Sequence, residues 1–405
     1  MSKLSKIRKD FPILDSKINE NNLVYLDNGA TTHKPRSVIK SISDYYSHFN
    51  SNIHRGVHRL SQISTDKYEN SRSVFQNFIN AKEKEEIIFT SGTTEAINLV
   101  ANSWGEKFIS KGDEVIISTL EHHSNIVPWQ MICEKQGAKL LIAAINKKGE
   151  LILDDFTKLL SKKTKIVSIA HISNTLGTIL PIKKIIKAAH NVGALVMLDS
   201  AQAIAHTKID VQDLNCDFLA FSIHKMYGPT GVGVLYGKKQ ILNAIPPYKG
   251  GGGMIGEVTF KKTSYADLPN KFEAGTPNIC GVIAGAEAVK YISKIGYDFI
   301  IKQENILLEY ATKEMKKIEG LQIIGNAKNK ASVISFIIDN THPFDVGTLL
   351  DQQGIAVRTG HHCTQALMSY YKIPGTIRAS FAFYNTLDEV NIFITAIKKV
   401  VILLK

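Results

Sequence analysis

The sequence predicts an α/β protein with an open, mostly parallel sheet of seven strands in a large domain, followed by a smaller C-terminal α/β domain. Short apolar runs alternate with helix-length amphipathic stretches from about Glu85 to Gly237, a pattern typical of a sheet covered by helices on both faces. A second strand-and-helix segment follows residue 275. The 405 residues, 44% of them hydrophobic, can bury the core of one large domain and one smaller one.

The seven candidate strands are short apolar runs separated by helix-length segments. They are Glu86–Thr90, Glu114–Thr119, Leu140–Ile145, Lys165–Ala170, Ala194–Asp199, Phe218–Ile223 and Gly233–Tyr236. Ligands of such a sheet collect at the carboxyl ends of its strands. Motifs that directly follow a strand are therefore the first candidates for a functional site.

The C-terminal part shows a helix-like stretch over Val282–Lys317 and candidate strands at Val333–Ile338 and Ala356–Arg358. Glycines make Lys249–Val258 too irregular for a regular element, and we expect a flexible loop or hairpin there. The predicted large domain covers residues 25–290. Residues 1–24 and 291–405 together form the predicted small domain.

Composition excludes several classes of protein. The formal net charge is +12, but the lysines are scattered rather than clustered with aromatic residues, so we expect no nucleic-acid or membrane partner, and an acidic protein partner stays open. No apolar run is long enough to span a bilayer and the first ten residues do not resemble a signal peptide, so the expected location is the cytoplasm. The four isolated cysteines predict neither a disulfide framework nor a zinc ribbon.

Two chemically distinctive side chains follow neighbouring strands of the predicted sheet. Lys225 follows one strand in FSIHKMYGPTGVGVLYG, and Asp199 in DSAQ ends the preceding strand. An aspartate at this edge can keep a pyridine nitrogen protonated, which makes pyridoxal phosphate an electron sink. A carboxylate buried for structural reasons would normally need an arginine partner, and none is obvious nearby. The pair therefore predicts a pyridoxal-phosphate site.

A phosphate site is predicted where SGTTEAIN, from Ser91 to Asn98, ends a strand and begins a helix. The hydroxyls of Thr93 and Thr94 and the amides of the first helical turn can hold a phosphate, although taken alone they are more typical of helix capping, and only the nearby Lys225 and Asp199 favour the phosphate site. Ser222 and His224, which flank Lys225, can donate to the same group.

His122 in EHHSNIVPWQ follows another strand and can stack on a pyridine ring, with a solvent-facing loop histidine as the alternative.

The order SGTTEAIN, EHHSNIVPW, HISNTLG, DSAQ, SIHKMYGPTGVGVLYG, FEAGTPN and RTGHHC resembles the cysteine desulfurases, pyridoxal-phosphate enzymes of fold type I among the class V aminotransferases. The resemblance extends from YLDNGATTHKP to RASFAFYNT. RTGHHC and the added KGGGGMIGE segment resemble the SufS type most.

The resemblance implies a role for each matching residue. Lys225 corresponds to the lysine that holds the cofactor covalently, and the other cofactor residues are Asp199 at the pyridine nitrogen, Gln202 at the hydroxyl, His122 on the ring, and Thr93, Thr94, Ser222 and His224 at the phosphate. Thr276 of FEAGTPN reaches the phosphate of the neighbouring subunit in this family, which implies a homodimer with shared active sites. Without the family, GTPN indicates only a turn.

The resemblance also implies an amino-acid substrate, L-cysteine. A guanidinium suits a carboxylate because its two parallel N–H groups donate to both oxygens. Arg378 in TIRASF matches the family's carboxylate ligand, with Asn174 of HISNTLG beside it and Arg358 as a further candidate. In an unrelated protein each would more often be a surface or capping residue.

Cys363 is the expected nucleophile, because a thiolate gains population beside a cation such as Arg358. His361 and His362 precede it, but consecutive side chains rarely converge on one tetrahedral ion, so no metal is expected. Cys133, Cys216 and Cys280 have apolar or helical surroundings and are expected in the core.

The family chemistry implied is removal of sulfur from L-cysteine to give alanine and a persulfide on Cys363. An acceptor protein of the SufE or SufU kind would then take the sulfur for iron–sulfur cluster assembly. Selenocysteine lyase activity at the same site, transamination or kynurenine cleavage, and a catalytically silent binding protein are the alternatives. Cys363 argues against the second, and the intact Lys225, Asp199 and Cys363 argue against the third.

One departure from the family is Gly29, where an alanine is more usual. Its backbone can still approach substrate, so we expect activity.

His54, Arg55 and His58 also resemble the family and are assigned no role. A role for His342 in docking or in zinc exchange with an acceptor protein stays open.

Overall fold

The computed structural model describes residues 3–404 and contains the expected seven-stranded sheet. Its order is β4-β10-β9-β8-β7-β5-β6, and only β10 runs antiparallel to its neighbours. The strands are β4 (Ile87–Thr90), β5 (Glu114–Ser118), β6 (Lys139–Ala143), β7 (Thr164–Ala170), β8 (Leu195–Asp199), β9 (Phe218–Ser222) and β10 (Gly233–Gly237). All seven predicted strands are confirmed, with each bound within two residues.

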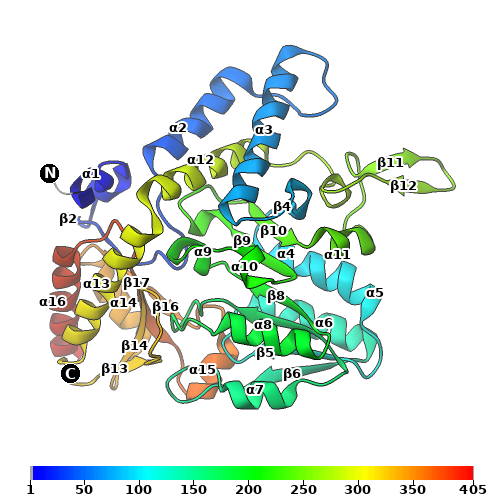
Figure 1. Ribbon diagram of the computed structural model, residues 1–405. Helices are drawn as coiled ribbons and strands as arrows, with labels where there is room; N and C mark the ends of the chain where they lie inside the picture. Colours follow the sequence, from blue (N-terminus) through cyan, green and yellow to red (C-terminus); the bar gives the residue numbers. More distant parts are fainter. Residues whose placement is uncertain (1–2, 405) are drawn as a thin grey trace.

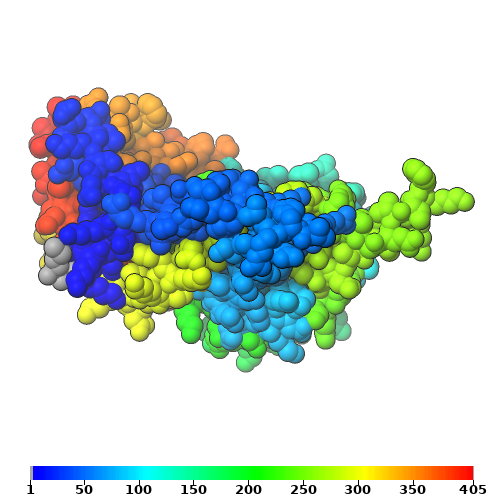
Figure 2. Space-filling model, turned by 90° about the horizontal axis from the view of Figure 1, so that it is seen from above, coloured from blue at the N-terminus to red at the C-terminus, as the bar shows by residue number. Residues whose placement is uncertain are grey.

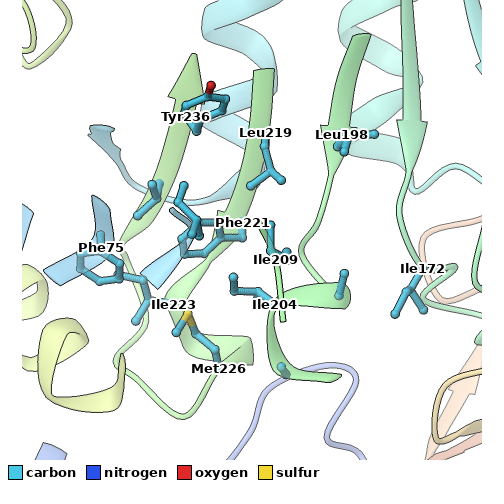
Figure 3. Close-up of a cluster of buried hydrophobic side chains, with 14 of the residues drawn as sticks. Phe75, Ile172, Leu198, Ile204, Ile209, Leu219, Phe221, Ile223, Met226 and Tyr236 are labelled. Atoms are coloured by element: carbon cyan, nitrogen blue, oxygen red, sulfur yellow. The ribbon is translucent and has the colours of Figure 1, made fainter. Parts of the chain in front are cut away.

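Alternating side chains cover the two faces of this sheet, because successive residues of a strand point to opposite sides. On β9, Phe218 packs with Trp129 on one face, whereas Leu219 and Phe221 pack with Phe75 on the other, as Figure 3 shows for the second face. Both faces are buried by helices (Figure 1), which explains why the strands are almost continuously apolar.

The helices divide between the faces by the core that they enter. One face carries α4 (Thr93–Leu99), α6 (Val127–Gln136) and α11 (Lys239–Ala244), with the short α5 (Glu106–Phe108) nearby. The other carries α3 (Arg59–Phe78), α7 (Leu153–Leu159), α8 (Ile182–Asn191), α9 (Ala203–His206), α10 (Val211–Leu214) and α12 (Ile279–Ile295). Helix α2 (Arg36–Asp44) lies on α12, and α1 (Lys3–Arg8) lies near the N-terminus.

A second, four-stranded antiparallel sheet has the order β13-β14-β17-β16 and a separate apolar core. Its strands are β13 (Leu321–Ile324), β14 (Val333–Ile338), β16 (Arg358–Gly360) and β17 (Thr376–Ser380), and its helices are α13 (Tyr297–Met315), α14 (Pro343–Asp351) and α16 (Leu387–Leu404). Helix α15 (Gln365–Tyr371) instead enters the large core through Leu367 and Met368.

The N-terminal segment joins this second unit. Strand β3 (Val24–Tyr25) pairs in parallel with β15 (Ile355–Ala356), and β1 (Lys17–Ile18) pairs with β2 (Asn21–Asn22). Val24 and Leu26 lie in the apolar core of the smaller sheet. The domain bounds at residues 24/25 and 290/291 stay a prediction.

One predicted helix was wrong. The stretch Val282–Lys317 forms two helices, α12 and α13, separated at Gly296. The backbone there has φ of 83°, a left-handed region that glycine enters without steric cost, so the chain turns between two apolar faces. The predicted strand Ala356–Arg358 likewise divides into β15 and β16 on either side of Val357.

The glycine-rich segment leads into a hairpin of β11 (Ile255–Val258) and β12 (Thr263–Tyr265), one of the two predicted outcomes. The hairpin projects from the body of the molecule (Figure 2). Phe260 at its tip is fully exposed. No helix within residues 3–404 is both long enough and apolar enough to cross a membrane.

Candidate active site

The carboxyl ends of β4, β8 and β9 converge on a cavity of about 240 Å³. All the predicted site residues except Thr276 line it. We call the part supplied by the large sheet the floor, namely Thr93, Thr94, His122, Asp199, Gln202, Ser222, His224 and Lys225. The part supplied by the smaller sheet and its loops is called the rim, namely Arg358, Cys363 and Arg378.

Lys225 and Asp199 form the charged centre of the floor, and both are buried. Burial lowers the pKa of the Lys225 amine, against the opposing effect of the Asp199 carboxylate. Burial also raises the pKa of Asp199, although the Ala201 N–H donates to its Oδ1 at 3.0 Å. Within residues 3–404 no arginine forms an ion pair with Asp199, so the carboxylate is free to hold a protonated ring nitrogen.

Hydroxyl and amide groups gather where β4 leads into α4. The Thr93 N–H donates to Ser222 Oγ at 2.8 Å, and the two hydroxyls lie 2.8 Å apart. A Cβ on Gly233 of β10 would lie 2.4 Å from the Cα of Gly92, so only glycine lets this turn lie against the strand. The cluster offers hydroxyl and amide hydrogen-bond donors at the start of a helix, and Asp199, the carboxylate among the described residues that line the cavity, ends a different strand, β8, so the cluster fits a phosphate group.

His122 lies on the floor as a neutral ring. Its Nδ1 accepts from the Ser124 N–H at 3.1 Å and lies 2.8 Å from Ser124 Oγ. Burial, followed by the nearby Lys225 charge, lowers the pKa of His122 to about 3. The Gln202 amide nitrogen donates to the Gly29 carbonyl at 2.8 Å, which orients its side chain beside Asp199.

The two arginines of the rim lie opposite each other on neighbouring strands, Arg358 on β16 and Arg378 on β17. Asp27 bridges them, with 3.2 Å from Oδ2 to Arg358 Nη1 and 3.2 Å from Oδ1 to Arg378 Nη2. Arg378 also donates from Nη1 to the Asn174 carbonyl at 2.9 Å. Its buried Nε has no hydrogen-bond partner within residues 3–404, so the guanidinium keeps donor capacity for a ligand carboxylate.

Cys363 lies in a short, tightly held turn. His362 and Cys363 have φ of 52° and 57°, a left-handed conformation that non-glycine residues adopt at a cost. The His123 N–H donates to the Cys363 carbonyl at 2.8 Å, and the Asn174 side-chain amide donates to the His362 carbonyl at 2.7 Å. Cys363 is the one exposed cysteine among residues 3–404, and the other three are buried as expected.

Sequence reasoning missed Asp27 and His362. His362 is buried, lines the cavity and places Nε2 2.8 Å from Thr376 Oγ1, while its Nδ1 has no hydrogen-bond partner in the part of the chain that the structure describes. Burial and then Arg378 lower its pKa to about 3. Asp27 lies inside the motif YLDNGATTHKP and His362 inside RTGHHC, both of which carried the resemblance. Their position in these motifs was the one sequence signal that could have identified them as site residues. Within residues 3–404 no histidine, cysteine and carboxylate cluster is arranged to hold a metal.

Several residues lie away from the cavity. Thr276 is exposed outside it, so its role at a neighbouring subunit stays a prediction. His54 pairs with Glu69 at 3.1 Å, and His58 caps α3. His342 is exposed and caps α14.

A family model described as aminotransferase class V matches residues 24–393. The chain belongs to this family. It is 47% identical, over 98% of its length, to the probable cysteine desulfurase of Mycolicibacterium paratuberculosis, and spans 58% of that protein. It is 48% identical to the probable cysteine desulfurase of Halalkalibacterium halodurans, over 97% of both chains.

Among solved structures, the apo cysteine desulfurase of Thermococcus onnurineus superimposes with a TM-score of 0.94 at 40% identity, covering 99% of this chain and 98% of that one. Class V membership and this match confirm the predicted fold type I architecture.

Proposed function

We propose that the chain is a pyridoxal-phosphate-dependent cysteine desulfurase that transfers sulfur from L-cysteine to Cys363. The observation that carries the proposal is that an exposed thiol lines the same cavity as a buried lysine and a buried carboxylate. The names of the relatives agree with this activity.

The floor fits the cofactor group by group. The Lys225 amine would hold its aldehyde carbon, Asp199 its ring nitrogen and Gln202 its hydroxyl. The neutral His122 ring offers a face for stacking, and Thr93, Thr94, Ser222 and His224 offer donors to its phosphate. When bound, pyridoxal phosphate supplies an electron sink for the negative charge left by loss of the substrate α-proton.

The rim binds and orients the substrate. Arg378 holds the α-carboxylate, because a guanidinium donates two parallel bonds to a carboxylate, and Asp27 fixes the plane of that guanidinium. Arg358 adds a second positive charge at the exposed edge, and Asn174 supports both Arg378 and the Cys363 turn.

Lys225 moves the protons. Because burial lowers the pKa of its amine, a larger fraction is neutral near neutral pH than for an exposed lysine, and the neutral amine accepts the substrate α-proton. Burial lowers the pKa of the two histidine rings on the floor, His122 to about 3 and His224 to about 4, so both stay neutral and neither competes as a cation.

Cys363 receives the sulfur. Its thiolate attacks the substrate sulfur, so that an S–S bond forms while the Cβ–S bond breaks and its electron pair stays on the carbon skeleton, which takes up a proton and leaves as alanine. Two basic side chains, Lys225 and Arg378, line the same cavity as Cys363. The pinned turn keeps the persulfide near the cavity mouth for an acceptor of the SufE or SufU kind and for iron–sulfur cluster assembly.

The proposal includes a homodimer in which Thr276 reaches the neighbouring subunit's phosphate site. The four free cysteines are typical of a reducing compartment such as the cytoplasm.

Selenocysteine is a second substrate that the same site would cleave, because selenium is the better leaving atom.

The test is turnover of L-cysteine under reductant, with alanine and sulfide quantified for wild type and Cys363→Ala. We expect stoichiometric alanine from wild type, and an intact visible cofactor band with at least about 100-fold less turnover in the variant. Cys133→Ala, at a buried cysteine outside the cavity, is the matched control. A colourless wild-type protein, or a Cys363→Ala variant as active as wild type, would refute the proposal.

A further inference from the structure

A second and larger cavity of about 1160 Å³ lies behind the active site, between α13, the segment that precedes α8 and the loop from residue 325 to 331. We call it the rear cavity. Its lining combines apolar side chains, among them Leu151, Ile179 and Ile323, with lysines, among them Lys316 and Lys330. Ile172 lines both the rear cavity and the active-site cavity. In Figure 3 Ile172 stands at the margin of the buried cluster.

The rear cavity holds a cation without a counter-ion. Among residues 3–404 no carboxylate forms an ion pair with Lys330, whose ammonium donates only to the Gly325 carbonyl at 2.7 Å. Burial, and then the neighbouring Lys316, lower the pKa of Lys330 to about 8. A desolvated ammonium beside a second lysine is costly, and an arriving anion would remove most of that cost.

The carboxylates that line the rear cavity do not offset these lysines. Glu304 pairs with His206 at 2.7 Å and accepts from Ser332 at 3.1 Å. Glu150 accepts from the Lys328 N–H at 2.8 Å and from Asn146. Glu309 is exposed to solvent. The cavity lining therefore combines apolar side chains with two lysines, Lys316 and Lys330, that form no ion pair within residues 3–404, which suits a small organic anion.

The wall between the two cavities is a turn that spans residues 172–179. On the rear side its backbone pairs with the loop that carries Lys330, through Ile179 N–H to Asn329 O at 3.0 Å and Ala331 N–H to Gly177 O at 2.8 Å. On the active-site side the turn presents Asn174, which binds the His362 carbonyl and accepts from Arg378. A shift of the loop would thus move the groups that hold the substrate carboxylate.

We propose that the rear cavity binds a small organic anion through Lys330 and Lys316, and that its occupancy changes substrate affinity through the 172–179 turn. The shared chemistry is a carboxylate or phosphate group on a compact body that contacts the apolar side chains of the lining. The second half of this proposal rests on the proposed function, because it concerns the amino-acid site. The binding half stands without it.

Binding is tested by calorimetry on the cofactor-loaded protein, whose own phosphate site is then filled, with inorganic phosphate and citrate as separate probes. We expect saturable binding of at least one probe, and at least tenfold weaker binding in Lys330→Ala. Lys302→Ala, an exposed lysine on α13 outside the cavity, is the matched control and should bind as wild type. Preference for phosphate or for citrate identifies the anionic group.

Arg378→Ala separates the two cavities, because it removes the other anion-binding group. Probe binding that survives in Arg378→Ala and is lost in Lys330→Ala supports the rear cavity. Absent binding, or binding lost only in Arg378→Ala, overturns the proposal.

Coupling is tested without turnover, by titrating L-cysteine into cofactor-loaded Cys363→Ala and following the visible band with and without the probe. We expect the apparent Kd to change at least threefold, and no change when Lys330→Ala is added. An unchanged Kd at saturating probe overturns the coupling and leaves the binding result to stand alone. If L-cysteine causes no change in the visible band, the proposed function is refuted instead. The calorimetry would still test whether the rear cavity binds an anion.

Discussion

The floor and the rim of the active-site cavity are built in different ways. Each floor residue lies within a few positions of the end of a strand in one sheet, and Lys225 and Asp199 are buried there. The rim comes from a second sheet, from the left-handed turn at Cys363, and from a bridge through Asp27 to the N-terminal segment. The comparison teaches that the floor residues are all held by one sheet, whereas the position of the proposed nucleophile and of the two arginines depends on how two units pack together.

The largest expected effect is on the floor. Lys225→Ala removes both the covalent anchor and the base, so turnover of L-cysteine should fall by about 10³-fold or more. The measurement is alanine production together with the position of the visible cofactor band. Lys183→Ala, an exposed lysine on α8, should keep wild-type values. Turnover within tenfold of wild type in Lys225→Ala would place the base elsewhere and remove the contrast between floor and rim.

The substrate-binding arginines of the rim should respond more weakly than the floor, and in substrate affinity rather than in turnover. Asp27→Asn keeps the size of the side chain but removes the charge that orients two guanidiniums, so we expect the KM for L-cysteine to rise about tenfold, with kcat changed less than threefold. Asp44→Asn, which breaks an exposed pair with Lys40, is the control. A lower KM would mean that Asp27 competes with the substrate carboxylate rather than positioning Arg378.

A smaller effect is expected at Gly29, where the resemblance to the family predicts an alanine. A Cβ on Gly29 would lie 3.3 Å from Arg378 Cζ and 3.3 Å from Ser380 Oγ. Both distances are shorter than an ordinary van der Waals contact, so Arg378 must shift by a few tenths of an ångström. Gly29→Ala should raise KM about threefold. Gly250→Ala, where nothing lies within 4 Å, should have no effect. An unchanged KM would show that Arg378 can move away from the added Cβ without a loss of substrate affinity.

The smallest effect concerns stability where the two units meet. Burial alone would lower the pKa of His206, but the Glu304 carboxylate at 2.7 Å raises it above the ordinary value. A raised folded pKa contributes stability that is complete below pH of about 6.5 and is lost as the pH rises through the folded value. Glu304→Gln should therefore cost about 2 kcal/mol at acidic pH and less at alkaline pH.

Denaturant unfolding of wild type and Glu304→Gln at several pH values measures that difference. A gap between the two proteins that grows with pH would contradict the assignment of a protonated His206 in the folded state. Lys317→Ala, which breaks an exposed pair with Glu314, should shift stability little at any pH.

Much of the fold was predictable because its signals are local. All seven strands of the large sheet follow from short apolar runs, since a strand buried on both faces needs apolar residues at nearly every position. The break at Gly296 was missed because apolar residues continue across it, although a glycine there was a possible helix end. The positions of Lys225, Asp199 and Thr93 followed from strand ends, since parallel strands end at one edge.

The sequence alone determined the large sheet, the floor of the site and, through motif order, the family. Only the tertiary structure decided that Asp27 bridges Arg358 and Arg378, that His362 lines the cavity, and that Lys330 lies beside a second cavity without a counter-ion. The physical reason is the separation along the chain of the residues that interact. A strand and the residue that follows it are specified by neighbours in the chain, whereas an ion pair between residues 27 and 378 exists only after two separate cores have formed and packed together.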